Sequence, residues 1–458
     1  MSSPSGASPT SPAAPSNRME VRAAASGTFG TALEFFDFGI YGALAASLFP
    51  KLFFNGLGSS GALLASFATF GVGFAARPLG AVVFGHLGDR YGRRPILYIT
   101  LAMMGAASIL IGLLPTGRGL VVAAILVTLR FVQGFSLGGE YTGNQLMVME
   151  HANRRRRGLL GSMAACGAPL SQVLSNLVLA ILAAVLSAEQ WASWGWRIPF
   201  LVSLAIVAVA AYIRFRLTET PAFVAQQDKD GGPEPTAKPS GLGIRVLLTH
   251  PREIATLALM WGGPAFCFYL IAVYGLTLMT HEGGVSSDVT FLILLIANAV
   301  SIPAAIAAGL LSDRIGRKRT IFIGLVGNIV GITLFFVFAP TGMVFPTAVA
   351  VAVGLSAVQW VGGVQPAIFA EAFPTYSRFS GSALAYTFAT LVFSAPAPLI
   401  ATALAAAGGI YAVLWLALGV MAVSLAALIP IIDRAGINLA DVGVSMRRSA
   451  KPASSASR

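Results

Sequence analysis

The sequence predicts an all-α polytopic membrane protein of about twelve transmembrane helices, built as two repeated halves of six. Of its 458 residues, 56% are hydrophobic and only 10% are charged, which is too little charge to cover a soluble protein of this length. A spanning helix needs about 20 apolar residues, and twelve such stretches account for most of the chain. Two loops of one pattern recur in corresponding places, which indicates the repeat.

The expected spans follow one another with short connections, except between the sixth and the seventh. We expect them at residues 28–52, 61–85, 96–114, 119–148, 158–186, 195–214, 254–280, 288–311, 320–339, 344–370, 380–405 and 409–431. The long connection carries Gln, Asp, Gly and Pro, which is a linker composition. The expected division is a disordered cytoplasmic tail at 1–26 without a signal peptide, a six-helix half at 27–215, a cytoplasmic linker at 216–252, a second half at 253–432 and a cytoplasmic tail at 433–458.

The positive charge indicates orientation. Net charge is +12, and Lys and Arg concentrate in every second loop and the C-terminal tail. Cytoplasmic loops carry such an excess, so we expect both termini inside, in the cell (inner) membrane. The charge is therefore not read as a nucleic-acid patch. The expected partners are the bilayer, protons and a small-molecule substrate, and the chain is expected to act as a monomer.

Catalytic and metal chemistry find little support in the sequence. The only cysteines, Cys166 and Cys267, lie far apart in apolar stretches, without disulfide or metal-ligand spacing. No nucleophile with a base, no phosphate loop and no metal cluster is visible. We expect neither an enzyme nor a cofactor, and the proton gradient as the driving force.

Two elements repeat in order. The loop from Gly85 to Arg94 and the loop from Gly309 to Lys318 share the pattern Gly-x-x-x-Asp-Arg-x-Gly-Arg-Arg/Lys. Further on, Glu150 precedes Arg157, as Glu371 precedes Arg378. Parallel repeats of this kind are the architecture of major facilitator transporters, with the substrate site between the halves.

Several further motifs make the resemblance specific. They are Glu34-Phe-Phe-Asp37-Phe-Gly-Ile-Tyr41-Gly42, Arg77-Pro78-Leu-Gly80, Arg130-Phe-Val-Gln133-Gly134 running to Glu140, Trp194-Gly-Trp-Arg197-Ile-Pro199 and Glu219-Thr-Pro221. Together with the repeated loops they resemble the metabolite:proton symporter family of the major facilitator superfamily, from about residue 27 to 432. The resemblance implies proton-coupled import, by alternating access, of an organic acid or a zwitterion. The alternative is a proton-driven efflux antiporter of a small amphiphilic compound. Such antiporters usually carry a Gly-Pro motif on the fifth span, and Gly167-Ala-Pro169 matches that motif poorly.

Five ionisable residues lie inside the expected spans, all of them in the N-terminal half. An ionisable residue within the membrane is costly and is a functional candidate by default. If the five form one cluster, three acids face two guanidiniums, and the acid left without a full-charge partner can carry a proton. The alternative is a static ion-pair network. The proton-coupling candidates are Glu34, Asp37, Arg77, Arg130 and Glu140.

Polar side chains on otherwise apolar helices are candidates for contact with substrate, or else form hydrogen bonds between helices. They are Tyr41, Gln133, Asn144, Gln172, Asn176, Tyr269, Tyr274, Gln359, Trp360, Gln365 and Tyr386. The resemblance assigns the repeated loops, together with the two acid–arginine pairs, to a cytoplasmic gate that stabilises one transport state; the alternative for the loops is a solvated basic segment that serves topology alone. The gate candidates are Gly85, Asp89, Arg90, Gly92, Arg93, Glu150, Arg157, Asp313, Arg314, Gly316, Arg317, Glu371 and Arg378.

Overall fold

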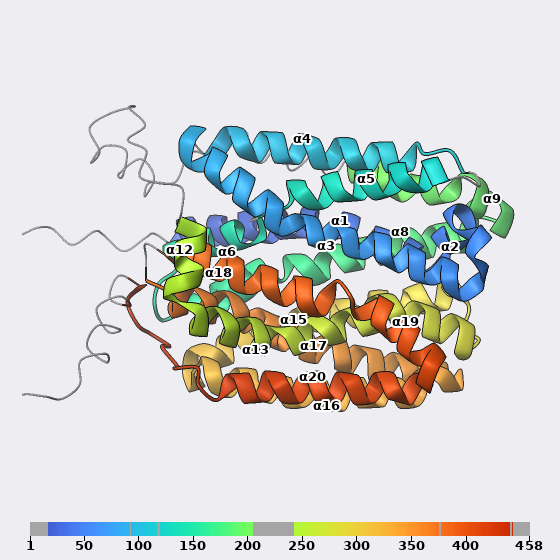
Figure 1. The fold of residues 1–458 in the computed structure, drawn as a ribbon. Coiled ribbons are helices and arrows are strands. Elements are labelled where there is room, and N and C mark those ends of the chain that lie inside the picture. Colours follow the sequence, from blue (N-terminus) through green and yellow to red (C-terminus); the bar gives the residue numbers. More distant parts are fainter. Residues whose placement is uncertain are drawn as a thin grey trace, which may run out of the picture.

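The computed structural model describes residues 17–91, 93–116, 120–138, 140–204, 242–374, 377–439 and 442, and these residues form helices and no strand. Long helices run side by side and form one bundle (Figure 1). In that view the N-terminal helices form the upper part of the bundle and the C-terminal helices the lower part. The all-α fold and its division into two groups of helices therefore agree with the sequence.

The N-terminal group begins with the longest uninterrupted stretches. Its helices are α1 (Asn17–Ser47), α2 (Phe49–Phe53), α3 (Gly58–Tyr91), α4 (Arg93–Gly112), α5 (Leu120–Ser136), α6 (Glu140–His151), α7 (Arg157–Ala165), α8 (Gly167–Val185) and α9 (Ala188–Ser193). Helix α1 starts within the expected tail, because a helix can continue past the bilayer where water and charges satisfy its polar groups.

The C-terminal group contains π-helical turns within two of its spans. Its elements are α12 (Leu242–Thr249), α13 (Pro251–Tyr269), η3 (Leu270–Tyr274), α14 (Gly275–Thr277), η4 (Leu278–Glu282), α15 (Ser287–Ile315), α16 (Arg317–Phe338), α17 (Val344–Ala372), α18 (Arg378–Ala389), η6 (Thr390–Ser394), α19 (Ala397–Gly408) and α20 (Ile410–Leu428). Turns η3, η4 and η6 are π-helical, a conformation found mostly as single turns and frequently at functional sites.

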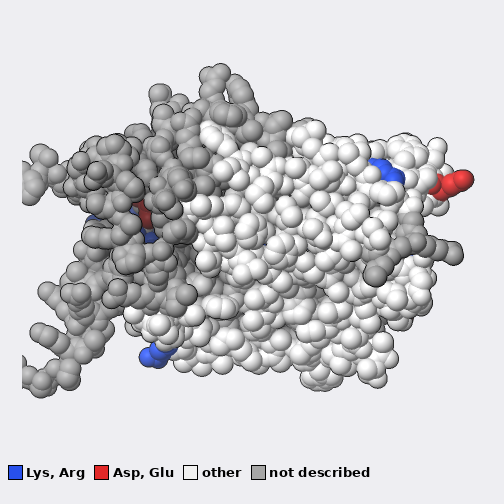
Figure 2. Space-filling model, turned by 45° about the horizontal axis from the view of Figure 1, so that its top comes forward, with Lys and Arg blue, Asp and Glu red and all other residues white. Residues whose placement is uncertain are grey.

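Nine helices within the described ranges are long and apolar enough to cross a membrane. Helix α1 and the shorter apolar part of α4 cover the first and third expected spans. Most of the sixth expected span lies outside the described residues. Figure 2 shows a broad side of the molecule without charged side chains between its two ends, as a bilayer requires.

The two halves touch at both ends of the bundle. At the end that carries α6 and α12, here called the latch end, Gly158 of α7 and Gly309 of α15 approach so closely that a Cβ on Gly309 would lie 2.6 Å from the Gly158 carbonyl oxygen. At the opposite end, the Thr277 hydroxyl donates a hydrogen bond of 3.2 Å to the Ala46 carbonyl oxygen. The halves therefore contact each other at both ends of the bundle.

Candidate functional site

A buried polar network lies inside the N-terminal half, where α1, α4 and α5 meet. The amide of Gln133 donates from Nε2 to Asp37 Oδ2 at 3.1 Å and accepts from Arg130 Nη1 at 2.6 Å. The Ser108 hydroxyl donates to the same carboxylate oxygen and accepts from Gln133 Nε2 at 2.8 Å. All four side chains are fully buried. We call this set, Asp37, Ser108, Arg130 and Gln133, the charge network. The amide of Gln133 separates the carboxylate of Asp37 from the guanidinium of Arg130.

Aromatic rings surround the guanidinium groups. Arg130 Cζ lies 3.9 Å from the centre of the Phe38 ring and 4.2 Å from that of Tyr41. Arg77 Cζ lies 4.3 Å from the centre of the same Phe38 ring and 4.9 Å from that of Phe74. The negative face of a ring attracts a cation, so these contacts offset part of the cost of burying two positive charges.

Both charged members of the network keep polar atoms without a hydrogen bond. Within the described part of the chain, Asp37 Oδ1 and Arg130 Nε and Nη2 have no hydrogen-bond partner. A buried charge that lacks partners costs more than one that is fully paired. The network can relieve this cost by moving Arg130 onto Asp37 or by protonating the carboxylate.

The structure brings together three of the five predicted coupling residues. Asp37 and Arg130 belong to the charge network, and Arg77 meets it through the Phe38 ring. Glu34 and Glu140 lie on α1 and α6, but their side chains are outside the described part of the structure.

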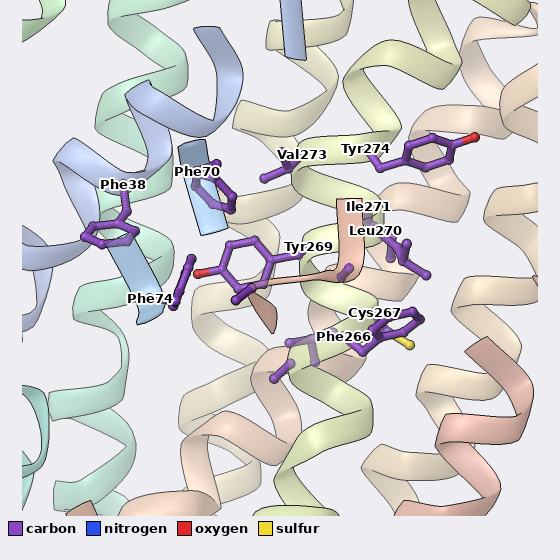
Figure 3. Close-up of a cluster of buried hydrophobic side chains, with 14 of the residues drawn as sticks. Phe38, Phe70, Phe74, Phe266, Cys267, Tyr269, Leu270, Ile271, Val273 and Tyr274 are labelled. Carbon is purple, nitrogen blue, oxygen red and sulfur yellow. The ribbon is translucent and has the colours of Figure 1, made fainter. Parts of the chain in front are cut away.

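A small cavity lies between the two halves, beside the charge network. It has room for about a single water molecule. Its lining comes from α1 and α8 on one side and from α13 and η3 on the other: Phe35, Phe38, Gly39, Gln172, Phe268, Tyr269, Ala272 and Val273. Figure 3 shows Tyr269 reaching from the C-terminal half toward Phe70 and Phe74. Two predicted substrate residues, Gln172 and Tyr269, face this space.

A second contact between the halves lies around Tyr141 of α6. Its ring centre is 4.3 Å from that of Tyr386, and its hydroxyl donates to Gln365 Oε1 at 3.5 Å. It also meets Phe35 edge-on at 5.5 Å. Tyr386 and Gln365 were predicted from the sequence, whereas Tyr141 was missed, because its place on the helix next to Glu140 gave no sign of which side it faces.

The other predicted polar residues lie outside the cavity lining. Tyr41 donates to or accepts from Thr69 Oγ1 at 2.8 Å beside Arg130, and Gln133 belongs to the charge network. Others make contacts within or between helices: Asn176 Nδ2 donates to Gln172 O at 2.7 Å, and Trp360 Nε1 donates to Thr320 O at 3.0 Å. The buried or half-buried side chains that remain are Asn144, Tyr274 and Gln359.

At the latch end, charged side chains form a direct and buried cluster across the halves. Glu371 of α17 accepts from Arg157 of α7 at 3.1 Å and from Arg317 of α16 at 3.1 and 3.2 Å. Arg317 also donates to Asp313 at 2.7 Å. Asp313 in turn accepts from the backbone amides of Gly158 and Leu159 at 2.8 and 3.0 Å, where an acid also suits the positive end of helix α7. This cluster, Arg157, Asp313, Arg317 and Glu371, is the latch.

The two repeated acid–arginine pairs exchange partners between the halves. Arg157 of the N-terminal half pairs with Glu371 of the C-terminal half, and Arg378 pairs with Glu150 at 3.8 Å. The first pair is buried, whereas the side chain of Glu150 is 45% exposed. The exchange ties the halves together, which neither pair could do within its own half.

The repeated loops are only partly described. Of the second loop, Gly316 has φ of 95°, a conformation suited to glycine, and Arg314 is exposed to solvent. In the first loop Gly92 is outside the described residues, and nothing is described of the side chains or surroundings at Gly85, Asp89, Arg90 and Arg93. Their role in a gate stays a prediction.

The segment after α20 lies across the latch, although the sequence predicts a tail there. Arg157 Nη1 donates to the Ile437 carbonyl oxygen at 3.1 Å, and Arg378 Nη2 donates to that of Leu439 at 2.7 Å. Arg434 donates to the carbonyl oxygens of Glu371 and Ala372 at 3.1 and 3.0 Å. Burial lowers the pKa of Arg434, but arginine stays charged at physiological pH. Backbone acceptors have no signature in the sequence, which is why these contacts were missed.

Comparison with known proteins agrees with this architecture. The family model described as Major Facilitator Superfamily matches residues 27–395. The inner membrane metabolite transport protein YhjE of Escherichia coli K12 is 35% identical over 387 residues, which cover 81% of this chain and 85% of that protein. The shikimate transporter of the same organism is 34% identical, with 84% and 87% covered. The proline/betaine transporter of that strain is 33% identical, with 81% and 75% covered.

A solved structure supports the fold independently. The proton:xylose symporter XylE, bound to 6-bromo-6-deoxy-D-glucose, superimposes with a TM-score of 0.72 over 93% of this chain and 98% of XylE. The two sequences are only 17% identical, so this likeness concerns the fold alone.

Proposed function

The chain belongs to the Major Facilitator Superfamily, and on that premise we propose that it imports a small polar metabolite together with protons by alternating access. Its named relatives are transporters, so the chain is a membrane transporter of small solutes and not an enzyme. What is proposed is the proton coupling, the direction of transport and the class of substrate.

The charge network is the observation that carries the proposal. Asp37 is a fully buried acid that, among the described residues, is linked to the Arg130 guanidinium through Gln133, and it directly precedes two residues that line the cavity between the halves. A carboxylate in this position can gain and lose a proton as its contact with Arg130 changes. Coupling follows if the change accompanies the binding and release of substrate in the cavity.

The latch supplies the conformational part. The Arg157–Glu371 ion pair, the hydrogen bonds from the Gly158 and Leu159 amides to Asp313 and the close approach of Gly158 and Gly309 join opposite halves and hold the latch end closed. Arg317 pairs with Asp313 and Glu371 within the C-terminal half. Opening at this end has to break them together, since they share Glu371 and Asp313. This is the behaviour expected of a gate in a transporter whose halves move as rigid bodies.

The substrate is a monoanion or a zwitterion. Two named relatives transport such solutes, namely shikimate in one case and proline or betaine in the other. Arg77 and Arg130 are the described intramembrane cations near the cavity, and Gln172 and Tyr269 offer polar groups inside it. One carboxylate matches this set better than several.

The Lys/Arg distribution places the latch end in the cytoplasm. With one named relative in an inner membrane, we place the chain in the cell (inner) membrane, with both termini cytoplasmic. A single chain contains both halves of the site, which fits transport by a monomer.

Uptake into proteoliposomes tests the proposal. Purified protein is reconstituted, and labelled shikimate, proline and glycine betaine are supplied with and without an inward proton gradient. We expect at least one compound to accumulate only with the gradient, and a protonophore to abolish accumulation. Expulsion of a compound driven by an inward proton gradient would instead identify an antiporter.

A further inference from the structure

We propose that Phe38 transmits substrate binding in the cavity to the charge network and thereby positions Arg130 relative to Asp37. The inference rests on the proposed function and adds a residue to it. Its basis is one juxtaposition: a single ring lines the cavity between the halves and also lies 3.9 Å from the guanidinium carbon of Arg130.

The helix separates two roles on consecutive residues. Neighbouring residues of an α-helix point about 100° apart, so Asp37 and Phe38 face different surroundings. Asp37 faces α4 and α5, where Ser108 and Gln133 hold its carboxylate. Phe38 faces the cavity that Tyr269 closes from the other half. The acid therefore lies behind the lining, and a substrate in the cavity meets the ring first.

Phe38 is the shared support of both cations. Its ring is almost fully buried and packs edge-on against Phe74 at 5.1 Å and Phe70 at 6.3 Å. Arg77 and Arg130 both lie within 4.3 Å of its centre. Among the described side chains, the charged and titratable groups that face Arg130 are Asp37 and Tyr41 of α1, Arg77 of α3 and Tyr269 of α13.

The cavity has to widen before a metabolite fits. A space for about one water cannot hold one, so the lining, which includes Phe38, has to move as the halves separate and substrate enters. Arg130 then loses its ring contact while its Nε and Nη2 already lack hydrogen bonds. Gln133 is hydrogen-bonded to Arg130 and also to Asp37, so the Asp37 carboxylate is the acid to which Arg130 can move.

Direct contact with Arg130 favours the ionised carboxylate, so in import this contact forms, and the proton leaves Asp37, once the loaded cavity has opened to the cytoplasm. In the reverse direction, a protonated Asp37 attracts Arg130 less, and the guanidinium rests on Phe38. Substrate and proton are thus linked through the position of one guanidinium group. No covalent change is involved.

Infrared spectroscopy tests the positioning without any substrate. The carboxyl band that Asp37→Asn removes is titrated in purified wild type, Phe38→Leu, Phe38→Tyr and Phe335→Leu. Phe335 is an equally buried ring in the C-terminal half and serves as the control. We expect loss of the ring in Phe38→Leu to let Arg130 reach Asp37 and move the midpoint of the band by about one pH unit toward acid. Phe38→Tyr and Phe335→Leu should titrate like wild type.

Transport supplies the second readout, with labelled shikimate, proline and glycine betaine as probes. In Phe38→Leu, gradient-driven accumulation should fall about tenfold, while exchange at equal pH stays within about twofold of wild type. An unchanged midpoint in Phe38→Leu, or an equal shift in Phe335→Leu, overturns the inference. If wild type accumulates none of the probes, the proposed function fails, and the infrared midpoint still decides the role of Phe38.

Discussion

The latch and the charge network contain the same kinds of side chain in opposite arrangements. In the latch, Glu371 meets two arginines directly, at 3.1 Å each, and Asp313 accepts from two backbone amides. In the charge network, Gln133 stands between Asp37 and Arg130, and the guanidinium rests on aromatic rings. One set of charges is paired; the other is held apart.

This difference suits two tasks. Directly paired charges at the end of the bundle stabilise the one conformation in which they meet, and water can solvate them when they separate. Charges held apart inside the bundle keep an unrelieved cost, so a small movement or one proton changes their balance. We therefore expect changes in the charge network to affect coupling, and changes in the latch to affect the choice of conformation.

The largest effect is expected from Asp37→Asn, which keeps the shape of the side chain and removes its charge. Gradient-driven accumulation should fall about a hundredfold, because no proton is carried at this position. Exchange at equal pH should persist, since the latch is intact. Glu34→Gln, on the same helix, is expected to reduce accumulation as well. Wild-type accumulation in Asp37→Asn would remove Asp37 from the mechanism.

A tenfold loss of accumulation is expected for Gln133→Leu. Without the amide, Arg130 and Asp37 lose the group that stands between them, and a direct pair holds the acid ionised. Uptake at a series of proton gradients measures the loss. Asn328→Leu removes a buried amide in the C-terminal half that donates to Gly324 O at 2.9 Å, and it should accumulate normally.

Latch variants should open the latch end without uncoupling. The native thiol of Cys166 reports this, because it is buried where α8 begins and faces the Ile302 carbonyl oxygen of the other half at 3.8 Å. In a Cys267→Ala background, Glu371→Gln should raise the rate of maleimide labelling about tenfold, since two arginines lose their partner. Arg314→Ala, on an exposed side chain, is the matched control.

The smallest effect is expected from Arg434→Ala, which removes two hydrogen bonds to the end of α17 but no ion pair of the latch. Labelling of Cys166 should rise about twofold. A rise as large as that of Glu371→Gln would mean that the segment after α20, and not the latch, holds this end closed.

Much of the fold follows from the sequence, because apolar length and repeated loops are properties of single segments. The charge of Asp37 and Arg130 also marks them without a structure, since ionisable residues in a membrane are rare. The sequence could not predict which charged residues pair. Arg157 lies close to Glu150 in the sequence, whereas in the structure it pairs with Glu371. Ser108 and Phe38 carried no signal, because an uncharged residue reveals its role only through its neighbours.

The pH dependence of exchange tests the division of tasks most directly. Exchange of a transported probe is measured at equal pH on both sides, over acid to neutral values, in wild type, Asp37→Asn and Glu371→Gln. We predict that exchange by Asp37→Asn no longer depends on pH, whereas Glu371→Gln keeps the wild-type dependence at a changed rate. A wild-type pH dependence in Asp37→Asn, or its loss in Glu371→Gln, would contradict the account.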